Sequence, residues 1–118
     1  MFKIMLLLID LLDCKISKLG TEYVGNEATT KSRRICQQWA ATYPHYHQYT
    51  QAYFPYDGPW GPGNRCRNPD NEPEGPWCYT MDPNVRWEYC DVPMCPGKFR
   101  EICNVVVFVW RKFKNQLK

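Results

Sequence analysis

Cysteine is the feature that most constrains how this chain can fold. The 118-residue sequence holds 7 cysteines, and six of them lie in the interval from Cys14 to Cys95. Cysteine at this density in so short a chain is typical of a scaffold cross-linked by disulfides in an oxidising compartment. The apolar fraction of 44% comes from aromatic residues and cysteines more than from long aliphatic runs. We therefore expect one small disulfide-rich domain and not a multidomain enzyme.

The positive charge of the chain is concentrated at one end. The formal net charge is +3, from 15 Lys and Arg against 12 Asp and Glu. Residues 14–95 carry 8 basic and 9 acidic side chains, whereas residues 96–118 have a net charge of +5. The cysteine-rich part therefore has no basic surplus that would favour nucleic acid as a partner.

Residues 1–13 resemble the beginning of a secretory signal. A lysine precedes an apolar stretch from Ile4 to Leu12, which is too short to span a bilayer. Asp10 interrupts this stretch, and no small-residue cleavage site precedes Cys14. Two interpretations stay open: a leader in the form of a truncated signal peptide, or an apolar segment that the mature chain keeps.

Residues 14–95 predict mostly loops with a few short antiparallel strands. From Pro44 to Pro76, 11 of 33 residues are Pro or Gly, which few helices or central strands tolerate. The best strand candidates are the aromatic-rich runs 77–80 and 86–89, joined through the turn-forming residues 81–84 (MDPN). We expect these two runs to pair as a hairpin near the centre of the domain.

The composition changes after Cys95. Pro96 and Gly97 form a break, residues 102–110 (ICNVVVFVW) are almost wholly apolar, and basic residues follow. Nine residues cannot cross a membrane as a helix. Three interpretations of the 96–118 tail stay open: an extraneous or truncated end of the gene product, an edge strand on the domain, or a membrane-surface segment with basic anchors. Cys103 lies in this tail and could bond to another chain if the other six cysteines pair among themselves.

Six cysteines allow about 15 pairings, and their spacing does not choose among them. The surrounding residues are more informative, because they form an ordered string of motifs: CQQW at 36–39, PHYH at 44–47, CRNPD at 66–70, PWCYT at 76–80, DPNVRWEYC at 82–90 and DVPMC at 91–95. With Gly20, Tyr23 and Gly25 upstream, this string resembles the kringle domain over 82 of the 118 residues, 14–95. The resemblance implies a small disulfide-rich fold, mostly loops with short antiparallel β-strands. It also implies three disulfides: Cys14 with Cys95, Cys36 with Cys78, and Cys66 with Cys90.

Two departures from the family pattern concern loops. Arg33 in TKSRRIC stands where the family usually has glycine, so a turn that needs a positive φ would be strained there. Residues 56–64 (YDGPWGPGN) are longer and richer in Pro and Gly than is usual. An aliphatic core residue is often found in that loop, and we expect Pro59 or Trp60 to take its place.

The sequence offers no credible catalytic or metal site. Neither Ser17 nor Ser32 has the context of a nucleophile, and both histidines, His45 and His47, lie in the PHYH motif. The cysteines lack the CxxC spacing of zinc sites and are better explained as bridges. The resemblance implies structural histidines that are buried or hydrogen bonded, and we expect Trp39, Tyr23 and Pro44 to serve the core and turns. We predict a non-enzymatic chain without a cofactor.

Six residues together suit a lysine side chain: Asp70, Glu72, Trp77, Tyr79, Arg86 and Trp87. On extended backbone the two carboxylates face one side and can share an ammonium group. The rings of Trp77 and Tyr79 would share a face and, with Trp87 opposite, form a trough for the aliphatic stem. Arg86 could bind a ligand carboxylate.

In kringles that bind lysine, the site resembles this arrangement position by position. Glu72 stands where an aspartate is usual and is one methylene longer, so the charge is kept and the geometry is looser. Some of these kringles have a second cation near the position of Tyr49. Its absence leaves Arg86 as the evident partner of a ligand carboxylate and predicts that internal lysines bind about as well as C-terminal ones.

The resemblance implies an extracellular module, secreted or part of an ectodomain, that recognises lysine side chains of protein partners. The alternative is a kringle of a receptor ectodomain or of a protease fragment that serves protein contact without binding lysine. Trp77, Arg86 and Trp87 are compatible with both, because they also brace many kringles that bind no lysine.

Overall fold

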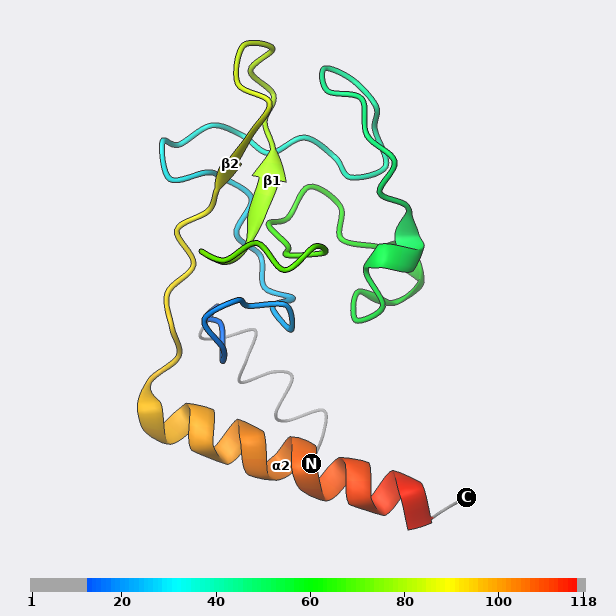
Figure 1. The fold of residues 1–118 in the computed structure, drawn as a ribbon, viewed down its shortest axis with the longest axis vertical. Helices are drawn as coiled ribbons and strands as arrows, with labels where there is room; N and C mark the ends of the chain where they lie inside the picture. Colours follow the sequence, from blue (N-terminus) through cyan, green and yellow to red (C-terminus); the bar gives the residue numbers. More distant parts are fainter. Residues whose placement is uncertain (1–12, 117–118) are drawn as a thin grey trace.

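The computed structural model describes residues 13–116, so the apolar stretch from Ile4 to Leu12 lies outside the described residues. The described part has little regular structure besides one long helix (Figure 1). Its elements in chain order are η1 (Gln51–Tyr53), η2 (Gly58–Trp60), β1 (Trp77–Tyr79), β2 (Trp87–Tyr89) and α2 (Gly97–Gln116). The helix and the turn of the hairpin lie at opposite ends of the molecule (Figure 1).

The two strands form the predicted antiparallel hairpin. Each is one residue shorter than the predicted run, and in their register Trp77 faces Tyr89 while Tyr79 faces Trp87. The turn between them is closed by the Val85 amide, which donates to the carbonyl of Asp82 over 3.1 Å. The hairpin therefore brings the aromatic residues of both runs to the middle of the domain.

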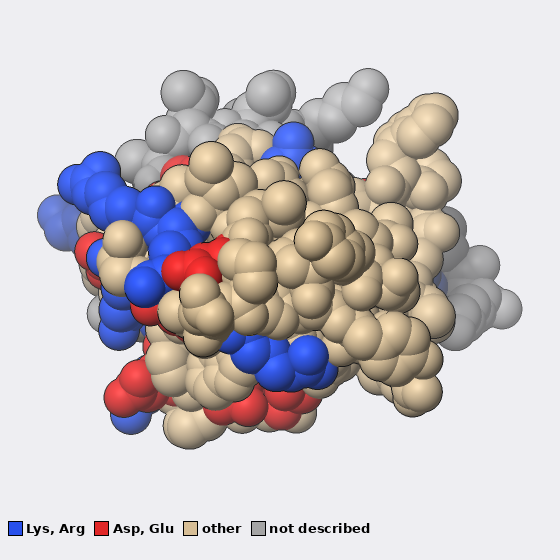
Figure 2. Space-filling model, turned by 90° about the horizontal axis from the view of Figure 1, so that it is seen from above, with Lys and Arg blue, Asp and Glu red and all other residues tan. Residues whose placement is uncertain are grey.

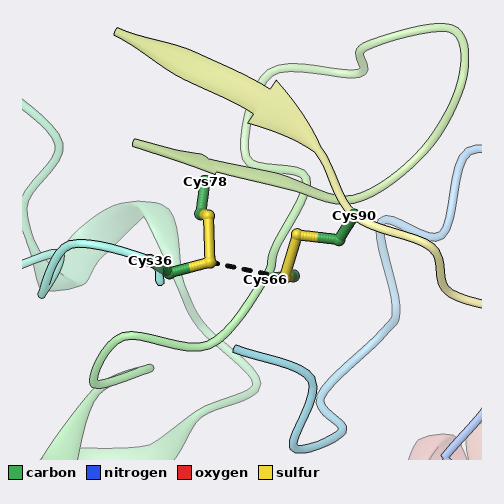
Figure 3. Close-up of side chains that lie close together, drawn as sticks. All are labelled: Cys36, Cys66, Cys78 and Cys90. Carbon is green, nitrogen blue, oxygen red and sulfur yellow. Dashed lines mark hydrogen bonds between the residues drawn. A yellow bond between two sulfur atoms is a disulfide. The ribbon is translucent and has the colours of Figure 1, made fainter. Parts of the chain in front are cut away.

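Three disulfides join the pairs that the resemblance implies: Cys14 with Cys95, Cys36 with Cys78, and Cys66 with Cys90. The last two lie side by side, with the sulfurs of Cys36 and Cys66 3.7 Å apart (Figure 3). Disulfide sulfurs carry no hydrogen, so this is a packing contact. The buried centre of the domain is thus built around two touching cross-links, and the first disulfide ties its ends together.

Aromatic rings pack around these cross-links, with Trp39 at their centre. Its side chain is 3% exposed, and its indole Nε1 donates to the carbonyl of Arg65 over 2.7 Å. Five rings pack against it at centroid separations of 4.9–6.1 Å: His47, Tyr49, Phe54, Trp77 and Tyr79. Tilted and edge-to-face contacts of this kind add to the free energy of burial. Trp39 is therefore a core residue, as predicted.

The N-terminal end of the domain is held by polar contacts around Tyr23, which is 2% exposed. The Tyr23 hydroxyl donates to the carboxylate of Asp13, and the amide of Asn26 donates to the same carboxylate over 3.2 Å. A side chain at Gly25 would collide with the Asp13 carboxylate and the Tyr23 hydroxyl. This close approach explains why glycine stands at position 25.

A buried ion pair that the sequence did not predict ties two loops together. Arg67 is 3% exposed, and its Nη2 lies 2.7 Å from the carboxylate of Asp57. Its Nη1 donates to the carbonyls of Gly25 and Cys66 over 2.9 and 2.7 Å. A charge this deep is tolerated only when it is paired and hydrogen bonded, and both conditions hold here.

The two departures from the family pattern have different outcomes. Arg33 does adopt a positive φ, 68°, in a turn that its amide closes by donating to the carbonyl of Thr30. The expectation that Pro59 or Trp60 fills the core is wrong, since both are exposed and Trp60 is 93% accessible. Phe54, which precedes this loop, is buried in the core, with its ring centroid 4.9 Å from that of Trp39.

Residues Gly97–Gln116 of the tail form helix α2, so the edge-strand interpretation is wrong. The apolar residues of this helix recur at the three- and four-residue spacing of a helix face. This spacing is easily overlooked, because many of these residues are valines, which favour strands. Within the described residues, no helix combines the length and the hydropathy needed to cross a membrane. Cys103 lies in α2, but its side chain is outside what the structure describes.

Candidate functional site

The hairpin carries a cluster of contacting aromatic rings whose exposed surface is mainly that of Trp87. Trp77 and Tyr79 flank the buried Cys78 on β1, and their ring centroids are 5.1 Å apart at 79°. Trp87 on β2 packs edge-on against Trp77 at 5.7 Å and is 39% exposed, whereas Trp77 and Tyr79 are 4% and 8% exposed. The two β1 rings share a face, as predicted, and Trp87 is the ring of the three that offers most surface to a ligand.

Asp70 lies beside this surface and is exposed. One carboxylate oxygen accepts a hydrogen bond from the Trp77 indole Nε1 over 2.9 Å, and the other accepts one from the Tyr49 hydroxyl over 3.2 Å. Burial and the Asp70 charge raise the pKa of Tyr49 to about 12, so its hydroxyl remains a donor well above neutral pH. The Asp70 carboxylate is therefore held in place by two aromatic side chains.

Glu72 lies near Asp70 in sequence but has different contacts. Its carboxylate accepts a hydrogen bond from the Tyr89 hydroxyl over 2.9 Å. The extended backbone that we expected between the two acids is wrong, because Asn71 has a φ of 59° and Asn68 bonds to the backbone of Glu72. The carboxylates are therefore placed by a turn, and each has its own tyrosine partner.

Arg86 supplies the positive charge of the site. Its guanidinium carbon lies 4.9 Å from the centroid of the Tyr79 ring, and its Nη2 donates to the carbonyl of Tyr46 over 2.8 Å. The pKa of Tyr79 is raised by burial, while the charges of Arg86 and Asp70 act on it in opposite directions. Arg86 therefore lies directly over the Tyr79 ring.

Charged side chains take up little of this end of the molecule. Viewed from the side that carries the hairpin turn, the surface is mostly uncharged, and acidic and basic groups gather toward one side and the lower edge (Figure 2).

The histidines are structural, as predicted. Both are buried, and the His45 ring Nε2 lies 2.9 Å from the carbonyl of Asp82. His47 stacks on Tyr79 at 4.8 Å, and its Nδ1 accepts the amide hydrogen of Tyr49. The sulfurs of four cysteines lie within 4.8 Å of one another, but all four are in disulfides and so are not the thiolates that bind metals.

Sequence reasoning missed three tyrosines that hold the charged groups. Tyr49 and Tyr89 donate to the two carboxylates, and the Tyr46 carbonyl holds Arg86. The sequence marks Tyr49 only as the position at which some lysine-binding kringles have a second cation. Tyr49 is two residues from His47, and the ring of His47 stacks on Tyr79 of the site. This spacing is the signal that could have placed Tyr49 at the site.

Comparison with known families matches this region. A family model described as Kringle domain matches residues 14–95, the interval that contains all three disulfides and the hairpin. Kringle domains are generally non-catalytic modules that bind proteins, and disulfide-bonded kringles are typically extracellular. Because the match covers more than half of the chain and the disulfide pairing agrees with it, this chain belongs to the kringle family.

Proposed function

We propose that this chain is an extracellular, non-catalytic module that recognises lysine side chains of protein partners. The observation that supports the proposal best is the fixed Asp70 carboxylate on one side of the aromatic surface, with Arg86 held over Tyr79. Three disulfides favour an oxidising compartment outside the cell. The module is a domain of residues 14–95, flanked by the 1–13 segment and the 96–118 tail.

The anionic end can accept an ammonium group without losing its internal contacts. A carboxylate oxygen has two lone pairs, so each oxygen of Asp70 can keep its present donor and accept a further one. Hydrogen bonds between an ammonium and a carboxylate are among the strongest in proteins. Asp70 is therefore the primary partner of the ammonium group, whereas Glu72 is bonded to the Tyr89 hydroxyl.

The aliphatic stem of lysine needs an apolar surface next to this anion. The exposed ring of Trp87 provides this surface, and the buried ring of Trp77 packs against it. A cation that lies near these rings also gains from their negative faces. The aromatic surface would thus bind the stem and add to the attraction for the charge.

The cationic end is the weaker part of the site. Arg86 is exposed, and Tyr49, at the position of a second cation in some lysine-binding kringles, donates to Asp70 at the anionic end. An exposed ion pair contributes little affinity. We therefore expect the dissociation constants of pentylamine, which lacks a carboxylate, and of 6-aminohexanoate to differ by no more than about fivefold. A much stronger preference for 6-aminohexanoate would contradict this description of the cationic end.

The test is titration of the oxidised chain with 6-aminohexanoate, followed by tryptophan fluorescence. Asp70→Asn removes the charge, keeps the shape, and should weaken binding at least about tenfold. Asp91→Asn is the matched control, because Asp91 is also exposed but lines a different hollow beside Glu27 and Arg33. Near-UV circular dichroism checks that both variants keep the native fold.

A second function has a specific observation in its favour. The tyrosine hydroxyls already on Asp70 and Glu72 could serve to brace the fold, as in a kringle of a receptor ectodomain or protease fragment that contacts proteins without binding lysine. No fluorescence response of the natively folded chain at millimolar ligand would favour this function and reject lysine recognition.

A further inference from the structure

Helix α2 presents a row of apolar side chains to solvent. Ile102, Val105, Val109 and Phe113 follow one another at intervals of three, four and four residues, which places them on one face of the helix. We call this row the α2 stripe. Its members are 53–61% exposed. A contiguous apolar surface that remains open to water marks an interaction site more often than a scattered apolar residue does.

The charge around the α2 stripe is positive. Lys112 and Lys114 are exposed and stand one residue on either side of Phe113, about 100° around the helix in each direction. Residues 96–118 carry 6 basic side chains against the single acid Glu101, whereas residues 14–95 are slightly acidic. The apolar row is therefore bordered by cations that the rest of the chain does not neutralise.

The domain does not need α2 to complete its core. The buried aromatic cluster around Trp39 and the disulfides lies within residues 14–95, and the helix begins only two residues after Cys95. In Figure 1 the helix runs along the end of the molecule that is farthest from the hairpin turn. The α2 stripe thus belongs to a separate surface, at a distance from the candidate lysine site.

We infer that α2 is a membrane-surface helix that binds anionic phospholipid. A helix with a bulky apolar row and a basic border lies in the plane of a bilayer, with the apolar row at the acyl boundary and the cations among the headgroups. At 20 residues α2 is about 30 Å long, enough to lie along the surface. The positive border favours this occupant over a second copy of the chain, since two such helices would bring like charges together.

The test uses the whole oxidised chain and sedimentation with vesicles. Vesicles of phosphatidylcholine with about 30% phosphatidylserine should bind the chain, and pure phosphatidylcholine should bind it much more weakly. Replacing both Lys112 and Lys114 by serine should weaken binding to the anionic vesicles about 25-fold, about fivefold for each charge removed. Binding should also weaken as salt is added.

A matched pair of variants separates the α2 stripe from the charge of the helix. Val109→Asp puts a negative charge on the stripe, and Asn104→Asp puts the same charge on the polar face; both positions are exposed. Val109→Asp should weaken binding at least about tenfold more than Asn104→Asp, because it also removes apolar contact with lipid. Since both side chains face solvent, the kringle fold should survive, and near-UV circular dichroism checks this.

Several outcomes would overturn the inference. Equal losses in the two aspartate variants would show attraction by charge alone, and no binding to anionic vesicles would reject lipid as the occupant. A dimer in solution that Val109→Asp dissociates, without vesicle binding, would assign the α2 stripe to a second copy of the chain. Binding of 6-aminohexanoate is measured separately in the same variants and should not change, so this inference and the proposed function can fail independently.

Discussion

At the scale of single residues, Arg33 shows a conformational cost that a sequence can reveal. Its φ of 68° lies in the left-handed region, where a Cβ atom is unfavourable and glycine is not. We predict that Arg33→Gly stabilises the domain by about 0.5–1 kcal/mol, the relief of the left-handed strain minus the entropy that glycine loses on folding. Urea unfolding of the oxidised chain, followed by tryptophan fluorescence, measures this change.

Arg33→Ala is the control for this prediction. Alanine keeps the Cβ atom and removes the rest of the exposed side chain, so it should give no comparable gain. If alanine stabilised the domain as much as glycine, the effect would come from the loss of the arginine side chain and not from the backbone.

The residues of the site show where prediction from sequence stops. The positions of Trp77, Tyr79 and Trp87 follow from local rules, since alternation along a strand and a short hairpin decide which rings meet. The Tyr49 hydroxyl and Asp70, which are in contact, are 21 positions apart in the sequence. No periodicity connects two loops, so only the folded chain shows that Tyr49 faces the anion.

At the scale of elements, the same reasoning explains the success with the hairpin and the failure with the tail. Two aromatic runs around a turn-forming stretch have few alternatives to a hairpin. Residues 102–110 combine valines, which favour strands, with a spacing that also fits a helix face, and a short apolar run does not choose between them. In the loop 56–64, Phe54 fills the core from just outside the stretch in which a core residue was expected.

Three segments meet at Tyr79, and a histidine in this contact predicts a pH dependence of stability. His47 stacks on Tyr79 of β1, and Arg86, which precedes β2, lies over the same ring. Burial lowers the pKa of His47 below its ordinary value, and the charge of Arg86 lowers it further. The folded chain therefore takes up a proton at His47 less readily than the unfolded chain does.

The sign follows from this difference. Above about pH 7.5, one unit above the ordinary pKa of histidine in an unfolded chain, the ring is neutral in both states, and the stability that it contributes is fully present. As the pH falls below that value, the unfolded chain binds the proton first, and the free energy of unfolding decreases. We predict this decrease between about pH 7.5 and pH 5.5 in urea unfolding, and a smaller one in His47→Gln. An unchanged slope in that variant would show that His47 is not the group responsible.

At the scale of the whole molecule, cross-links rather than core size decide whether the chain folds. The disulfides span 81, 42 and 24 residues, which in the loop-entropy treatment correspond to about 4.5, 4 and 3.5 kcal/mol as upper values. A core of this size rarely supplies more than about 3–5 kcal/mol by itself. Its buried apolar side chains are mainly aromatic rings and the cystines themselves.

We therefore predict that full reduction and alkylation unfold residues 14–95. Without cross-links, packing of the aromatic cluster around Trp39 would have to order long Pro- and Gly-rich loops that form few backbone hydrogen bonds. The entropic cost of ordering these loops exceeds the free energy that packing of the cluster provides. Near-UV circular dichroism should lose its aromatic signal, while a sample alkylated without reduction keeps it. A reduced chain with the native near-UV spectrum would mean that the aromatic core holds the kringle together and that the disulfides only reinforce it.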